Sequence, residues 1–186
     1  MRCLLLLALL LGACLTSWAQ PAALVPDGKP LPASKLPVVP LTKGQPGPDF
    51  RLMDTSGRAV ALRDLRGKVV YLDFWYSGCR PCLAEAPAAA KLKQQFASQE
   101  VVFVYISIET NVNNWQQAVK KNALAGPASI HLLDPEGNYA TRAYHVEGFP
   151  TYLLLDRQGR VWDGNAPRPS DGARTVQAIE QALATR

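Results

Sequence analysis

The chain has 186 residues, of which 48% are apolar and 19% are charged, and its formal net charge is +5. This composition excludes wholesale disorder, and the length suits one ordinary domain with additional leader and tail segments. The positive excess is modest, and no run of lysine or arginine is interleaved with aromatic residues, so the sequence argues against a nucleic-acid-binding protein.

The first 19 residues have the pattern of an export signal, in which a positive residue is followed by an apolar run at 4–11 and then by small residues. The apolar run is shorter than the about 20 residues that cross a membrane, which argues against a permanent span. Residues 11–14 resemble a bacterial lipobox that would make Cys14 a lipid anchor, whereas residues 17–19 resemble an ordinary signal-peptidase site. The sequence predicts an exported, periplasmic protein that is either soluble or tethered as a lipoprotein.

Proline is concentrated in residues 20–46, where apolar periodicity is weak. At this density proline favours extended polyproline II and excludes a packed helix, so we interpret this stretch as a semi-rigid linker. The domain then takes residues 47–186. It begins with two short strand-like runs, 50–53 and 59–62, around a turn cluster at 54–57, which predicts a β-hairpin.

Residues 69–75 form a near-continuous apolar run, typical of a strand that is covered on both faces. The run leads into Cys79-Arg80-Pro81-Cys82, where the proline suits the first turn of a helix. Free N–H groups at a helix start, the helix dipole and the arginine charge all stabilise a thiolate there. Cys79 is therefore the predicted nucleophile, and Cys82, one turn later, is the predicted resolving cysteine. Cys3 and Cys14 lie in the leader, so the domain contains only this one pair, whereas a disulfide scaffold would need several pairs.

A helix is predicted at residues 83–97, with a bend at Pro87. The remaining predicted elements are a strand at 101–108, a helix capped by Asn111 or Asn113, a strand at 130–133, a turn at 134–138, a short helix at 139–144, strands at 152–155 and 160–162, and an amphipathic helix at 175–184.

This order of elements resembles the thioredoxin fold, and more closely the exported TlpA/ResA-like thiol–disulfide oxidoreductases. The resemblance extends from Asp49 to the C-terminus and rests on three motifs: Asp73-Phe74-Trp75 before the cysteine pair, Glu85 and Pro87 after it, and Gly148-Phe149-Pro150-Thr151. It implies an α/β fold, with a central mixed sheet flanked by helices and an extra N-terminal β-hairpin. It also implies an enzyme without a bound cofactor or metal, which works through a redox-active Cys79–Cys82 disulfide.

The resemblance implies roles for three further residues. Pro150 would be a cis-proline beside the disulfide, where neighbouring backbone pairs with an incoming peptide; an ordinary trans loop proline is the alternative. The acid that helps to deprotonate the resolving cysteine would match Asp73 in thioredoxins and Glu85 in the ResA-like branch. Burial raises the pKa of such an acid, which lets it accept a proton near neutral pH. We favour Asp73 over Glu85, whose alternative is a solvated residue at a helix start.

One position departs from the family pattern. Most relatives carry tryptophan immediately before the first cysteine, whereas this chain has Gly78. Loss of that ring leaves the exposure of the disulfide and the choice of partner open. Trp75 and Tyr76 remain nearby, and we interpret them as ordinary core and surface aromatics.

The predicted function is an exported thiol–disulfide oxidoreductase that reduces disulfides of exported partner proteins and is itself supplied by a membrane thiol reductant. A disulfide-donating oxidase is the near alternative, because the redox potential sets the direction. A second class is a copper- or zinc-binding thioredoxin-fold chaperone, in which His131 or His145 would join the cysteines, although structural zinc needs four ligands. A peroxidase is a third option, but Tyr76 occupies the position where its Thr-x-x-Cys motif needs threonine.

Overall fold

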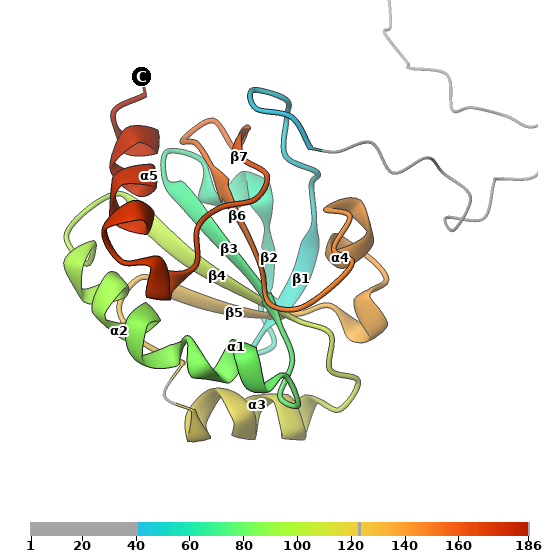
Figure 1. Cartoon of the computed structure of the whole chain (residues 1–186). Coiled ribbons are helices and arrows are strands. Elements are labelled where there is room, and N and C mark those ends of the chain that lie inside the picture. The colour runs from blue at the N-terminus through green and yellow to red at the C-terminus, as the bar shows by residue number, and fades with distance from the viewer. Residues whose placement is uncertain (1–40, 123, 186) are drawn as a thin grey trace, which may run out of the picture. The chain divides into compact units, whose positions relative to one another are not determined.

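The computed structural model of the protein describes residues 41–122 and 124–185. Within them a seven-stranded sheet has the order β2-β1-β5-β4-β3-β6-β7 (Figure 1). The strands are β1 (Arg51–Asp54), β2 (Ala59–Ala61), β3 (Val69–Trp75), β4 (Val101–Ser107), β5 (Ser129–Leu133), β6 (Thr151–Leu155) and β7 (Val161–Asp163). The helices are α1 (Arg80–Ala84), α2 (Ala86–Gln95), α3 (Val112–Lys121), α4 (Ala140–Ala143) and α5 (Ala173–Leu183), and the 3-10 turns are η2 (Leu62–Leu65), η3 (Pro135–Gly137) and η4 (Pro169–Asp171).

The sheet is mixed. β3 pairs in parallel with β4 and antiparallel with β6, and β5 extends the parallel part on the other side of β4. The β1–β2 hairpin is antiparallel and adds to the edge of β5. This arrangement confirms the predicted α/β fold with a central mixed sheet and an extra N-terminal hairpin.

β3 is buried on both faces because its alternate side chains enter two separate hydrophobic clusters. Tyr71 and Trp75 enter a cluster that also contains side chains of α2, α3 and α5 and both cysteines of the pair. Leu72 and Phe74 enter the other cluster, with side chains of η2 and a residue of α4. Successive strand residues point to opposite faces, so a strand covered on both sides needs a continuous apolar run. The pair Cys79–Cys82 therefore belongs to the α2, α3 and α5 face.

The single helix predicted at 83–97 is wrong, because the structure has two helices that meet at Glu85. Glu85 ends α1 and also starts α2, which places Pro87 in the first turn of α2. A proline in a helix interior would remove a hydrogen bond and clash with the preceding turn, whereas the first turn tolerates it. The predicted bend is thus a break two residues before the proline.

The first described residues lie along β7. The Gly44 N–H donates to the Val161 carbonyl at 2.7 Å, and the Val161 N–H donates to the Gln45 carbonyl at 2.9 Å. The Lys43 ammonium lies 3.3 Å from the ring centroid of Trp162. Packed structure therefore begins a few residues before the predicted domain start at Gly47.

The predicted signal at 1–19, the candidate anchor Cys14 and most of the predicted linker lie outside the described residues. Within the described part of the chain, every helix is too short or too polar to pass through a bilayer.

Candidate active site

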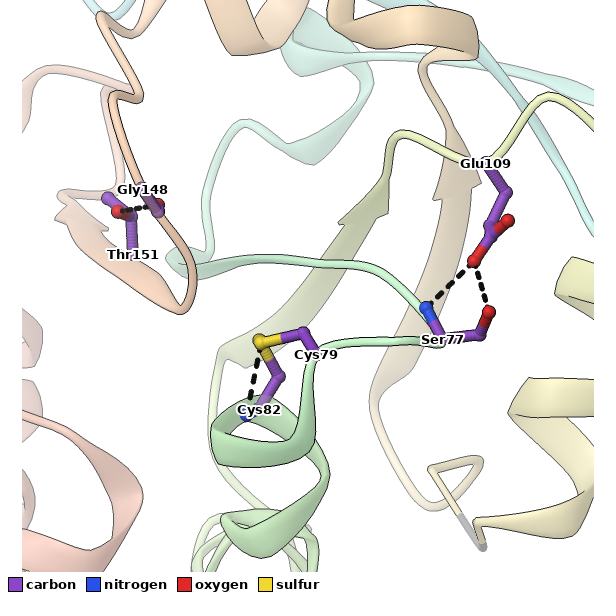
Figure 2. The surroundings of a disulfide bond; sticks show 6 residues. All are labelled: Ser77, Cys79, Cys82, Glu109, Gly148 and Thr151. Carbon is purple, nitrogen blue, oxygen red and sulfur yellow. Dashed lines mark hydrogen bonds between the residues drawn. A yellow bond between two sulfur atoms is a disulfide. The ribbon is translucent and has the colours of Figure 1, made fainter.

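The cysteine pair sits where β3 ends and α1 begins. The Cys79 N–H donates to the Tyr76 carbonyl at 3.0 Å, which turns the chain out of the strand. Cys79 is the N-cap of α1, and its Sγ accepts the Cys82 N–H at 3.2 Å. The two cysteines are joined in a disulfide, with their Cα atoms 5.3 Å apart (Figure 2). In the reduced protein the same N–H group and the helix dipole favour a thiolate at Cys79.

A carboxylate holds the turn just before the pair. Oε1 of Glu109 accepts the Ser77 N–H at 2.8 Å and also accepts the Ser77 hydroxyl (Figure 2). Glu109 follows β4, whose carboxyl end lies beside that of its parallel neighbour β3. Sequence reasoning missed this residue, and the signal that could have found it is an acidic residue directly after the strand that pairs with β3.

The loop before β6 faces the same end of the sheet. β6 pairs antiparallel with β3, and this pairing sets Thr151 opposite Phe74. The Phe149–Pro150 peptide is cis, as the family resemblance implies, and the Thr151 hydroxyl donates to the Gly148 carbonyl at 2.7 Å (Figure 2). The first residues of β6 and the residues that lead to the cysteine turn are therefore neighbours.

Asp73 is a buried acid on β3. It alternates with Leu72 and Phe74, so it points to the same face as Tyr71 and the cysteine helix. The side chain is only 7% exposed, and its Oδ1 has no hydrogen-bond partner. Burial, and after it the nearby Glu85 charge, raise the pKa of Asp73, the Lys93 charge opposes the rise, and the resulting pKa is about 8. A carboxyl with this pKa exchanges its proton close to neutral pH.

Glu85 is buried at the junction of α1 and α2, in contrast to the solvated alternative. Its Oε2 accepts the Ser170 N–H and its Oε1 accepts the Ser170 hydroxyl, both at 2.9 Å. Both carboxylate oxygens are thus held by η4. Ser170 is 85 residues away in the sequence, so no local sequence pattern predicts its hydrogen bonds with Glu85.

Lys93 is a buried cation of α2 that sequence reasoning also missed. It is 2% exposed, its Nζ donates to the Leu124 carbonyl, and this Nζ lies 5.2 Å from the ring centroid of Tyr105. Burial lowers the pKa of Lys93, and the Asp73 charge raises it. Each of the two charges therefore favours the ionised form of the other: Lys93 lowers the pKa of Asp73, and Asp73 raises the pKa of Lys93.

The family model for Redoxin matches residues 42–183. The chain belongs to the Redoxin family. This Redoxin chain is 33% identical over 147 residues to the thioredoxin-like protein YneN of Bacillus subtilis, which covers 78% of the chain and 81% of the relative. It is 34% identical over 140 residues to the thiol-disulfide oxidoreductase ResA of Geobacillus thermodenitrificans, 75% of each protein. A crystal structure from Chlorobium tepidum, of a protein described as the thiol:disulfide interchange protein DsbE, has a TM-score of 0.67 and 32% identity, and covers 77% of this chain and 99% of that one.

These likenesses confirm the predicted family and the enzyme class: this Redoxin chain is a thiol–disulfide oxidoreductase. The metal-binding alternative gains no support from the described residues, because no group of three or more His, Cys, Asp or Glu side chains is placed there to hold a metal ion. His131 instead stacks on Tyr105, with the ring centroids 4.7 Å apart. Burial and the Lys93 charge lower the pKa of His131 to about 4, so the ring is neutral at physiological pH.

Proposed function

We propose that the protein is exported and reduces disulfides of exported partner proteins through Cys79 and Cys82. The observation that carries this proposal is the closed Cys79–Cys82 disulfide at the first turn of α1. The disulfide belongs to the hydrophobic cluster on the face of β3 to which the buried acid Asp73 points, in a chain similar to thiol-disulfide oxidoreductases. The reducing direction is favoured because Asp73 and Pro81 resemble those of thioredoxins.

The reaction starts from the dithiol form. The Cys79 thiolate attacks one sulfur of the partner disulfide, a mixed disulfide forms, and the other partner sulfur leaves as a thiolate. Cys82 then loses its proton and attacks Cys79, the bond to the partner breaks, and the Cys79–Cys82 disulfide closes. Two electrons pass from the cysteine pair to the partner, which leaves with two reduced sulfurs.

Asp73 is the proposed acceptor of the Cys82 proton. Its Oδ1 has no hydrogen-bond partner, and the pKa of about 8 makes uptake of a thiol proton nearly balanced. Glu85 is the second candidate acid, but both of its oxygens already accept hydrogen bonds from Ser170. We also propose that Pro150, whose peptide bond to Phe149 is cis, lies beside the reacting sulfurs, where it would offer neither an N–H nor a competing nucleophile.

Each turnover leaves the cysteine pair oxidised, so the protein needs a source of electrons in the oxidising exported compartment. A membrane thiol reductant is the proposed source. The leader pattern supports export, and Cys14 in its lipobox-like context is the candidate lipid anchor that would hold the domain near such a reductant.

The function is tested with the two cysteine variants. Cys82→Ser should stall the reaction at the mixed disulfide and retain partner proteins through Cys79, because no second thiol can release them. Cys79→Ser should retain none. The trapped species is measured as a reducible high-mass band, identified by mass spectrometry. The proposal fails if both variants capture the same proteins or if Cys82→Ser captures none.

The direction is tested by equilibrating the pair with glutathione. Thioredoxin, a reductase, has a reduction potential of about −270 mV, whereas that of a dedicated disulfide donor is about −120 mV. A value in the second range would make the protein an oxidase.

A further inference from the structure

Both cysteines of the pair are covered, although a partner must reach Cys79. Cys79 is only 4% exposed and Cys82 is 6% exposed. Two partly buried aromatic side chains, Tyr76 and Phe149, pack against the hydrophobic cluster that contains both cysteines. Their rings meet edge to face, with centroids 5.4 Å apart and planes at 84°. Because both rings are only half-buried, their outer parts remain available to another molecule.

The two rings come from two separate segments of the backbone. The Tyr76 carbonyl accepts the Cys79 N–H, so the tyrosine belongs to the same tight turn as the nucleophile. Phe149 immediately precedes the cis Pro150, in the loop that enters β6 beside the end of β3. The two rings therefore join the two segments that flank the redox pair.

Gly78 makes room for this arrangement. A Cβ atom at position 78 would lie 3.0 Å from Cε2 of Tyr76, closer than ordinary van der Waals contact. The tyrosine ring thus occupies the space that a side chain directly before Cys79 would need. The aromatic ring near Cys79 therefore belongs to Tyr76, two positions before Gly78. The hydrogen bonds from Ser77 to Glu109 hold the turn between Tyr76 and Cys79.

We propose that Tyr76 and Phe149 form an aromatic rim that limits access to Cys79 and selects partner segments with an apolar side chain next to the reacting cysteine. An apolar side chain gains free energy when it is buried against the rings, whereas a charged one would lose hydration against their apolar faces. The contact between two rings is weak enough for a partner to displace it. The selection of partners rests on the proposed function, but the limit on access does not.

Access is tested on the oxidised protein with a small phosphine reductant, which needs no protein partner. Tyr76→Ala should speed reduction of the Cys79–Cys82 disulfide by about fivefold, in line with the loss of one edge-to-face contact. Tyr76→Phe keeps the ring and should match the wild-type rate. Tyr139→Ala is the matched control, because Tyr139 is 68% exposed and lies in another loop. Equal rates for Tyr76→Ala and wild type would overturn the limit on access.

Selection is tested with two peptide disulfides that differ only in the residue next to the cysteine, leucine or glutamate. The wild type should reduce the leucine peptide with a kcat/KM about tenfold higher, mainly through KM, and Tyr76→Ala should lose most of this preference. Equal values in the wild type, or an unchanged preference in the variant, would overturn the selection. Reduction of neither peptide would instead count against the proposed function. If Tyr76→Ala does not fold, Tyr76→Leu and Phe149→Leu each remove one ring and must give both changes.

Discussion

Asp73 is the residue whose surroundings oppose its charge most directly. It lies in an apolar strand, and its Oδ1 finds no hydrogen-bond donor. An unused carboxylate is costly in such a place, since burial favours the neutral acid. The cost is understandable if the neutral and charged forms interchange during turnover. In that case Asp73 takes up and releases a proton on the face of the sheet that carries the cysteines.

The closing step of the reaction should therefore depend on pH through Asp73. Asp73 accepts a proton only when ionised, so the rate of Cys82 attack should rise with pH around the pKa of about 8. In Asp73→Asn the rise should move to the higher pH at which an unassisted thiol ionises, and the rate below pH 8 should fall at least about tenfold. The step is measured by stopped flow, as release of the second aromatic thiolate when the reduced protein reacts with an aromatic disulfide.

Glu85→Gln is the matched comparison for this step, since it neutralises the second buried acid. It should leave the rise near pH 8 in place. A wild-type pH profile that survives in Asp73→Asn and is lost in Glu85→Gln would assign the proton transfer to Glu85.

The same residue should make stability depend on pH. The pKa of Asp73 is about 8 in the folded protein and near 3.8 in the unfolded chain, so between these values the folded state binds more protons. The folded state therefore loses stability as pH rises from 4 to 8, and below pH 4 this penalty is absent. Asp73→Asn removes the penalty. Its free energy of unfolding relative to wild type should rise by about 2 kcal/mol or more over that range, measured by urea denaturation at several pH values.

At the scale of elements, α2 provides the charge that faces Asp73. The side chain of Lys93 turns inward from this helix and ends on the Leu124 carbonyl and near the Tyr105 ring. A buried ammonium needs such partners, because burial alone favours its neutral form. The titratable groups around Asp73 are then Glu85 from the α1–α2 junction, Lys93 from α2, and the tyrosines Tyr71, Tyr105 and Tyr152 from three strands.

Removing the Lys93 charge should move the Asp73 titration. Lys93→Met has a similar shape without the charge, so the pKa of Asp73 should rise, and the pH profile of the closing step should shift about one unit to higher pH. Lys91→Met changes an exposed lysine of the same helix and should leave the profile unchanged. A shift of equal size in an Asp73→Asn background would show that the lysine acts elsewhere.

Local patterns were sufficient for most elements but not for the contacts between them. The continuous apolar run of β3 and the Asn111 cap of α3 are visible in the sequence, because strand periodicity and capping act over a few residues. The break at Glu85 does not follow from the sequence, because Pro87 is compatible both with a bend inside one helix and with the first turn of a second helix. The hydrogen bonds between Ser77 and Glu109 form only because β3 and β4 are neighbours, and strand order depends on the packing of the whole sheet.

At the scale of the molecule, one sheet separates two hydrophobic clusters, and the redox pair belongs to only one of them. The cluster that contains the cysteines also receives α2, α3 and α5, so buried acid, buried lysine and disulfide share one low-polarity environment. Charges interact more strongly there than in water. The opposite cluster, with η2 and a residue of α4, packs on the other face of the sheet.

The domain boundary gives a prediction for the whole chain. Contacts separate a compact unit that spans Val38–Arg186, and within it residues 41–46 lie along β7. A fragment of residues 38–186 should therefore match the chain that begins at Gln20 in melting temperature and in reduction of a protein disulfide. A fragment of residues 47–186 loses two backbone hydrogen bonds to Val161 and the Lys43 contact with Trp162. The loss should cost about 2 kcal/mol, or roughly 4–8 °C in melting temperature, measured by circular dichroism. Equal melting of both fragments would place the start of the domain at Gly47, and lower stability of 38–186 than of the longer chain would place it earlier.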